Sequence, residues 1–301
     1  MPRTIVVAAR GEDDPTRDAV ALAVLLARAL HARVVLAGVV ASPLWPGDGL
    51  YERAVRTELQ QQLELVRETL PQDVASSVQV RGSTSVVRGL HRLAEELDAD
   101  VLVLGPSHFG TLGRIARGDV ALTTLHDAPC AVAVAPHGLR DAASEGPARI
   151  VVGFDGSPEA RDALEAAVEL AAGLGATVQV VHAVETPQQL ADHLWVGAPT
   201  PEGWAEELRA QGEEALEEAR ILVGSRAPVE TLLAEGVPSQ ELARAAAGAT
   251  LAVVGSRRFG ALRRLVLGST SAELLSKAEL PVLVLPRAAA DPAATPKPVA
   301  T

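Results

Sequence analysis

The sequence contains the same pattern twice, and this internal repeat limits the folds that the chain can adopt. The run TIVVAARGEDDPTRDAVALAVLLARALHARVVLAGVV near the start matches RIVVGFDGSPEARDALEAAVELAAGLGATVQVVHAV, so that Ile5 corresponds to Ile150. A second match relates VLVLGPSHFGTLGRIARG, from Val101, to LAVVGSRRFGALRRLVLG, from Leu251. Because the matches keep their order and the length changes fall between them, the sequence predicts two related domains.

The length of the chain agrees with two domains, since 301 residues correspond to two units of about 150 residues. The run HGLRDAASEGPA, residues 137–148, is polar, small and rich in turn-forming residues, which is typical of a linker. We therefore expect a first domain over residues 1–137 and a second over residues 148–287. The last stretch, residues 288–301, has no periodicity and is predicted to be a disordered tail.

Each half alternates short apolar runs with helical patterns. In the second half, strands are expected at residues 149–154, 177–184, 229–233, 251–255 and 282–285, and helices at residues 158–172, 201–222, 239–247 and 269–278. Pro158 and Pro201 suit the first turn of a helix. Val- and Leu-rich strands that alternate with helices predict an α/β fold with a doubly wound parallel sheet in each half. Ligands of such folds bind at the carboxyl ends of the strands, which here means the loops after the first and fourth strands.

Composition excludes several classes of protein. The net charge of −11 and an aromatic content of 2% argue against a general nucleic-acid binder. A single cysteine, Cys130, excludes an internal disulfide framework, and burial as a small apolar residue is its expected role. No apolar run reaches the length of a membrane span and no signal-peptide pattern precedes the first strand, so a cytoplasmic protein without membrane contact is expected.

The segment after the fourth strand of the second half suggests an anion site. Gly255 ends that strand, and Gly268, Ser269 and Thr270 begin the next helix. Unpaired backbone N–H groups and the helix dipole favour a phosphate there, and the arginines between these ends make the loop basic. An N-capped helix after a solvated loop would explain the same residues. Asp155 likewise can accept hydrogen bonds from a ribose, or serve only as the turn residue of a D-G pair.

These residues resemble the universal stress protein family, over residues 3–287. Nucleotide-binding members carry G-x-x-G-x(9)-G-[ST] after the fourth strand, which Gly255 and Gly268-Ser269 match in spacing. The resemblance implies strand order 3-2-1-4-5 in each domain and a second-half site for ATP or another adenine nucleotide, with Mg²⁺ left open. It assigns this site to Gly153, Asp155, Ala183, Val254, Gly255, Arg258, Gly268, Ser269 and Thr270.

Arg258 departs from the family motif, because it occupies the middle glycine position. An arginine there can pair with a phosphate, or it can fill the phosphate path. We expect weakened triphosphate binding, because close backbone approach depends on the absence of a Cβ atom.

The first half departs further from the motif. Arg10 stands at the aspartate position, His108 at the middle glycine, and Asp119 where serine is expected. A carboxylate facing a phosphate is repulsive, so we expect the first half to hold no nucleotide. The alternative is that Arg10 and His108 reshape the site for a different anion.

Three functions remain open at this point. The first is a stress-response protein that binds an adenine nucleotide without dedicated catalysis, and the second is an interaction scaffold with no nucleotide. A slow ATP hydrolase is the third, although the sequence offers no clear water-activating residue. The resemblance also implies that the fifth strands, residues 131–135 and 282–285, lie side by side across a pseudo-two-fold axis. A homodimer of the whole chain and the identity of any protein partner are left open.

Overall fold

The computed structural model describes residues 3–41, 49–106, 120–142, 147–185, 203–256, 268–277 and 279–286. We call the part up to residue 142 the first half and the part from residue 147 the second half. The elements of the first half are β1 (Thr4–Ala8), α1 (Asp14–Leu30), β2 (Arg33–Ala41), α2 (Leu50–Glu68), β3 (Ser76–Ser83), α3 (Val86–Glu96), β4 (Val101–Leu104), α4 (Val120–Leu125), β5 (Ala131–Val134) and the short 3-10 helix η1 (Leu139–Asp141).

The second half repeats this order of strands and helices. Its elements are β6 (Arg149–Gly153), α5 (Pro158–Leu174), β7 (Thr177–Val184), α7 (Trp204–Val223), β8 (Val229–Glu235), α8 (Pro238–Ala245), β9 (Leu251–Gly255), α9 (Ser269–Lys277) and β10 (Val282–Leu285). The predicted strands match to within two residues at every end, and three of them match at both ends. The second described helix of this half, α7, begins at Trp204, whereas the expected start at Pro201 lies outside the described residues.

Local signals explain why the first helix of each half begins and ends where it does. In α5, the Ser157 hydroxyl accepts a hydrogen bond from the N–H of Ala160, Pro158 occupies the first turn, and Gly175 ends the helix in a left-handed conformation. In α1, Asp13 caps the N–H of Thr16 in the same way. Both helices therefore leave the carboxyl end of their preceding strand at a fixed position.

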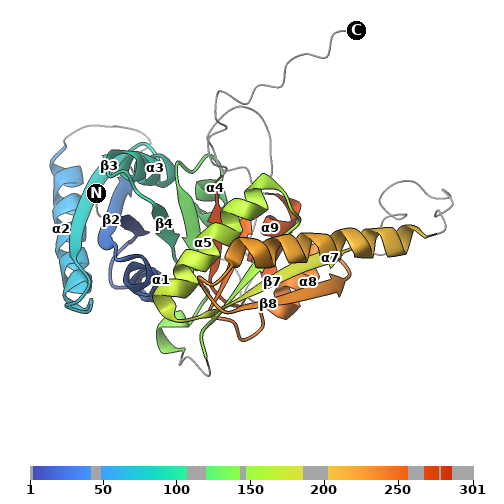
Figure 1. Cartoon of the computed structure of the whole chain (residues 1–301). Coiled ribbons are helices and arrows are strands. Elements are labelled where there is room, and N and C mark those ends of the chain that lie inside the picture. Colours follow the sequence, from blue (N-terminus) through green and yellow to red (C-terminus); the bar gives the residue numbers. More distant parts are fainter. Residues whose placement is uncertain are drawn as a thin grey trace, which may run out of the picture.

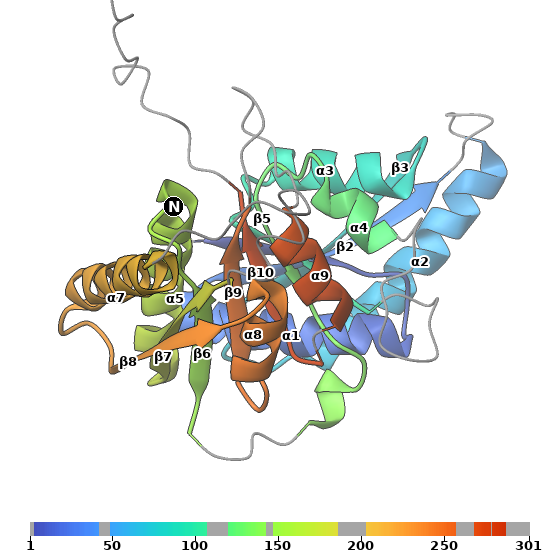
Figure 2. The same cartoon turned by 90° about the vertical axis from the view of Figure 1, so that its right-hand side faces the viewer.

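All ten described strands form one sheet, in the order β3-β2-β1-β4-β5-β10-β9-β6-β7-β8. Each half has the predicted order 3-2-1-4-5 with parallel pairing, which confirms the fold class. The predicted contact between the fifth strands is also confirmed. β5 and β10 pair antiparallel, with Leu283 opposite Ala133 and Val284 opposite Val132, and this pairing relates the halves as a pseudo-dimer (Figure 2).

Helices cover both faces of the sheet, which gives three layers (Figures 1 and 2). One buried apolar cluster includes residues of α1, α2, α5 and α7, and the other includes residues of α3, α4, α8 and α9. Both clusters run through both halves, and α1 contacts α5 across the pseudo-two-fold axis. The central strands are buried on both faces, which explains their lack of polar alternation.

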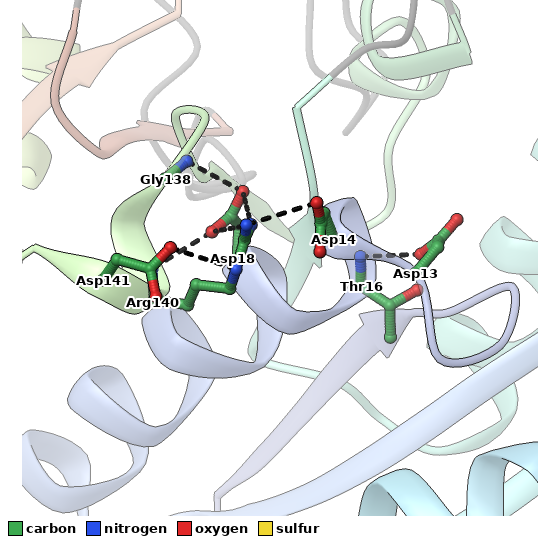
Figure 3. Close-up of polar contacts among 7 residues, drawn as sticks. All are labelled: Asp13, Asp14, Thr16, Asp18, Gly138, Arg140 and Asp141. Carbon is green, nitrogen blue, oxygen red and sulfur yellow. Dashed lines mark hydrogen bonds and ion pairs between the residues drawn. The ribbon is translucent and has the colours of Figure 1, made fainter.

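A buried carboxylate holds the connection between the halves against α1 (Figure 3). The Asp18 side chain is 0% exposed, and it accepts hydrogen bonds from the N–H groups of Gly138 and Arg140, each at 3.0 Å. The Arg140 guanidinium lies 3.3 Å from the same carboxylate and 3.2 Å from Asp14. Because all these donors converge on one buried acceptor, the chain leaving β5 has a fixed path toward β6.

Replacing Asp18 by asparagine tests this anchor. The amide has only one accepting oxygen, so a linker N–H loses its partner and Arg140 loses a buried counter-charge. We expect Asp18→Asn to lower the free energy of unfolding by about 1–3 kcal/mol in urea denaturation. The matched control is Asp14→Asn, whose side chain is 65% exposed; it should cost less than about 1 kcal/mol. Equal effects of the two variants would contradict the anchor.

Candidate functional site

A cavity of about 570 Å³ opens at the carboxyl ends of β6 and β9, where the strand order of the second half reverses. This is the crevice between the loops after the first and fourth strands that the fold class predicts. The residues around it are Gly153, Phe154, Asp155, Ser157, Glu159, Ala160, Val181, His182, Ala183, Pro238, Leu242, Val254, Gly255, Ser256, Gly268, Thr270 and Ser271.

Most of the predicted site residues meet around this one cavity. They come from β6 and the following loop, from β7, from β9, and from the start of α9: Gly153, Asp155, Ala183, Val254, Gly255, Gly268 and Thr270. Arg258 lies outside the described residues, as does the side chain of Ser269, with which α9 begins. The structure therefore brings the two distant sequence segments together, while the expectations for Arg258 stay predictions.

Asp155 shapes the turn that leaves β6. One carboxylate oxygen, Oδ1, accepts a hydrogen bond from the N–H of Ser157 at 3.0 Å, and Ser157 in turn caps α5. This is the turn role that the D-G pair allows. The same exposed residue lines the cavity, and its second oxygen is not needed for this turn. Both interpretations of Asp155 are therefore compatible with its position.

The start of α9 is tied closely to the end of β9. The Ser271 hydroxyl donates to the carbonyl of Gly255 at 3.0 Å, and Gly268 accepts the first helical hydrogen bond, from the N–H of Ala272, at 2.9 Å. A Cβ atom at Gly255 would lie 2.6 Å from the carbonyl oxygen of Glu159, so this position accepts only glycine without a backbone shift. The first-turn N–H groups of α9 have no acceptor within the helix, and Gly268, Thr270 and Ser271 of this end line the cavity.

An apolar wall and a fixed histidine complete the cavity. Leu242 of α8 packs against the end of β6 so closely that a Cβ atom at Gly153 would lie 3.0 Å from it. His182 donates from Nδ1 to the carbonyl of Phe154 at 2.8 Å, which ties β7 to the loop after β6. The apolar surface suits a flat ring, while the polar groups lie at the loop and at α9.

Sequence reasoning missed the contribution of α8. Pro238 and Leu242 line the cavity from this helix, and Val181 does so from β7. The helical spacing of the α8 pattern marks Leu242 as a buried position, and its side chain is 6% exposed in the structure. That spacing does not say which neighbour the leucine meets, so its place in the cavity follows only from the packing of α8 beside β6.

The corresponding turn of the first half is built differently. Arg10 stands where the second half has Asp155, and its guanidinium lies 3.1 Å from the carboxylate of Asp13. Its backbone N–H donates to the hydroxyl of Thr16 at 3.2 Å. After β1 the first half therefore has a cation, Arg10, paired with the helix cap Asp13, where the second half has the anion Asp155 after β6. His108, Gly118 and Asp119 lie outside the described residues.

Comparison with known proteins agrees with this architecture. The model of the universal stress protein family matches residues 1–136 and 147–286. The chain belongs to the universal stress protein family. A universal stress protein of Mycobacterium tuberculosis is 30% identical over 213 residues, which cover 68% of this chain and 70% of that protein. The universal stress protein YxiE of Bacillus subtilis is 32% identical over 148 residues, covering 46% of this chain and 97% of the relative.

Solved structures show the same fold for this universal stress protein. A universal stress protein from Archaeoglobus fulgidus covers 95% of this chain, and 98% of its own chain, with a TM-score of 0.66 at 18% identity. In the part of the chain that the structure describes, no helix combines the length and apolar character needed to cross a membrane. Among the same residues, no three histidine, cysteine or acidic side chains are grouped to hold a metal ion.

Cys130 has the buried apolar environment expected from the sequence. It precedes β5 and is 7% exposed, and burial raises the pKa of its thiol from the usual 9.0 to about 12. The thiol of the unfolded chain ionises at lower pH. The contribution of this group to stability is therefore complete below pH 9.0 and decreases as the pH rises toward about 12.

This burial predicts an unreactive thiol. In the folded protein at about pH 8, Cys130 should react with Ellman's reagent at least about a hundredfold more slowly than in the denatured chain, because reaction requires an exposed thiolate. The rate is measured from the release of the coloured thiolate. A folded-state rate close to the denatured rate would show that the thiol is accessible and able to take part in redox chemistry.

Proposed function

We propose that this universal stress protein binds one adenine nucleotide, in the cavity of its second half, and acts in the stress response through this binding. The observation that carries the proposal is the cavity itself. It combines an apolar wall, a carboxylate and a helix N-terminus around one space of about 570 Å³. These are the three surfaces that a base, a ribose and a phosphate require.

Asp155 is proposed to bind the ribose. Its Oδ1 atom is occupied by the N–H of Ser157, which fixes the carboxylate in orientation. The remaining oxygen can accept hydrogen bonds from ribose hydroxyls. The base is then proposed to lie against Leu242 and Val181, with the backbone of Ala183 at its edge.

The phosphate end is proposed to lie at Gly255, Gly268, Ser269 and Thr270. The bond from Ser271 to the carbonyl of Gly255 holds the strand end beside α9. Backbone N–H groups of the first helical turn then face the anion. Arg258 is proposed to weaken binding of a triphosphate relative to AMP or adenosine. ATP remains a candidate ligand, with or without Mg²⁺.

The first half is proposed to hold no nucleotide. Arg10, paired with Asp13, offers a cation where the second half offers a carboxylate, so the ribose would lose its acceptor. Binding rather than dedicated catalysis is proposed for the second half, in the cytoplasm. Among the described residues around the cavity, the one histidine, His182, already donates from Nδ1 to the carbonyl of Phe154.

Asp155→Asn tests the ribose contact without removing the turn. The asparagine oxygen can still accept the N–H of Ser157, whereas its NH₂ group replaces the accepting oxygen. Calorimetric titration of the parent with AMP should give about one site per chain, and Asp155→Asn should lower the affinity for AMP about tenfold or more. Urea denaturation should show that the stability of the variant is within about 0.5 kcal/mol of the parent.

Arg10→Gln is the matched control in the first half, and it should leave the AMP affinity within about twofold of the parent. Two equal sites per chain would contradict the assignment to the second half. The absence of any binding of AMP, ADP, ATP or adenosine by the parent would favour the alternative function of an interaction scaffold. Hydrolysis of ATP that Asp155→Asn abolishes would instead indicate an enzyme.

A further inference from the structure

A second, larger groove lies in the first half, at the outer end of the sheet. Its volume is about 860 Å³, and it lies among the carboxyl end of β3, one face of α3 and the turn after α4. β3 is the terminal strand of the sheet, so the groove is separate from the cavity at β6 and β9. Its lining residues are Gly82, Ser83, Thr84, Val87, Arg88, His91, Arg92, Glu95, Thr123, His126 and Asp127.

Two arginines in this groove lack the partners that most other arginines of the protein have. Arg88 and Arg92 are exposed and lie one helical turn apart on α3. Across the described ranges, neither side chain makes a hydrogen bond or an ion pair, although the charge of Arg92 contributes, after that of Arg81, to lowering the pKa of Glu96. The nearby acid Glu96 is already bound by both terminal nitrogens of Arg81, one of them at 2.7 Å. Two guanidinium groups on one helix face are therefore available to a ligand.

The second half shows why Arg92 is unpaired. Counted from the N-caps Ser85 and Val237, Arg92 corresponds to Arg244, which donates to Glu241 one turn earlier, at 2.5 Å. The residue that corresponds to Glu241 is Gly89. A Cβ atom there would lie 2.5 Å from a methyl group of Val39, so the packing of α3 excludes an acidic side chain at this position.

The walls of the groove are held at a fixed distance. His91 donates from Nε2 to the backbone carbonyl of Thr124 at 2.8 Å, which joins α3 to α4. Ser83 and Thr84 place hydroxyl groups at the end where α3 begins, and the dipole of this helix adds positive potential there. Glu95 lies one turn beyond Arg92 on α3, so an acceptor follows the two arginines along the groove, and Asp127 after α4 is the second carboxylate in its lining.

We propose that this groove binds a small phosphate monoester. The phosphate lies between Arg88 and Arg92, because guanidinium groups match the several oxygens of a phosphate. The hydroxyl-bearing organic part extends toward Glu95, whose carboxylate accepts its hydrogen bonds. In the second half the positions that correspond to Arg88, Arg92 and Glu95 are Gln240, the paired Arg244 and Ala247, so the proposed site belongs to the first half alone.

Arginine side-chain NMR tests the proposal on the whole chain. The probes are inorganic phosphate, glucose 6-phosphate and unphosphorylated glucose, each followed by the Nε–Hε signals, which are assigned with single arginine variants. We expect the signals of Arg88 and Arg92 to shift saturably with both phosphates and not with glucose. Arg88→Gln/Arg92→Gln should weaken the binding of glucose 6-phosphate about tenfold or more, as measured by calorimetry with adenosine, which carries no phosphate, present in excess to occupy the adenine site.

The matched control is Arg17→Gln/Arg53→Gln, which removes the same charge from two exposed arginines of α1 and α2. The side chain of neither arginine makes a hydrogen bond or an ion pair among the described residues. The control should change the affinity less than about twofold. Shifts of Arg17 and Arg53 equal to those of Arg88 and Arg92 would reveal only general ionic screening and overturn the site. Equal affinities for inorganic phosphate and glucose 6-phosphate would overturn the proposal of an ester ligand, because Glu95 would then contribute nothing to binding.

Discussion

The antiparallel pairing of β5 with β10 is the interaction on which the rest of the structure depends. It joins two five-stranded sheets into one sheet of ten strands and places α1 against α5 across the same axis. Without it, each half would present an apolar strand edge, and such edges promote aggregation. The pairing also explains why both apolar clusters continue from one half into the other. Two similar domains thus share one core.

This shared frame allows the two halves to differ at their ligand-facing ends. The turn residues Arg10 and Asp155 follow the last paired residues of β1 and β6, so they can differ without changing the strand pairing. In the second half the Asp155 carboxylate begins the turn beside the cavity, whereas in the first half the Arg10 guanidinium forms an ion pair with Asp13. The nucleotide is proposed to bind in the second half, whereas the phosphate groove is proposed for the first half, which alone has the pair Arg88 and Arg92 without side-chain partners in the described part of the chain. Duplication of one fold therefore presents two different sets of side chains at the strand ends of one chain.

The connection between the halves has a structural role of its own. Its polar and small residues indicate a linker, yet Asp18 binds two of its N–H groups and the guanidinium of Arg140. A fully buried carboxylate is tolerated only when its acceptors are satisfied, and here the linker supplies the donors. The linker is thus part of the fold of the first half over residues 138–141.

The sequence by itself determined the repeat and the positions of the strands, because parallel strands are recognisable as apolar runs. Together with the family resemblance it also predicted the strand order and seven of the residues around the cavity, since the carboxyl ends of parallel strands must lie at one edge. The family resemblance predicted that residues 131–135 and 282–285 lie side by side, while the register of this pairing came only from the structure. Tertiary structure alone decided the entry of Leu242 into the cavity, the burial of Asp18 under the linker and the unpaired state of Arg92. These depend on which neighbours an element meets, and periodicity gives the buried face of a helix without its partner. The close contact of Gly89 with Val39 shows the reason, since a distance between residues fifty positions apart is set by packing and not by local pattern.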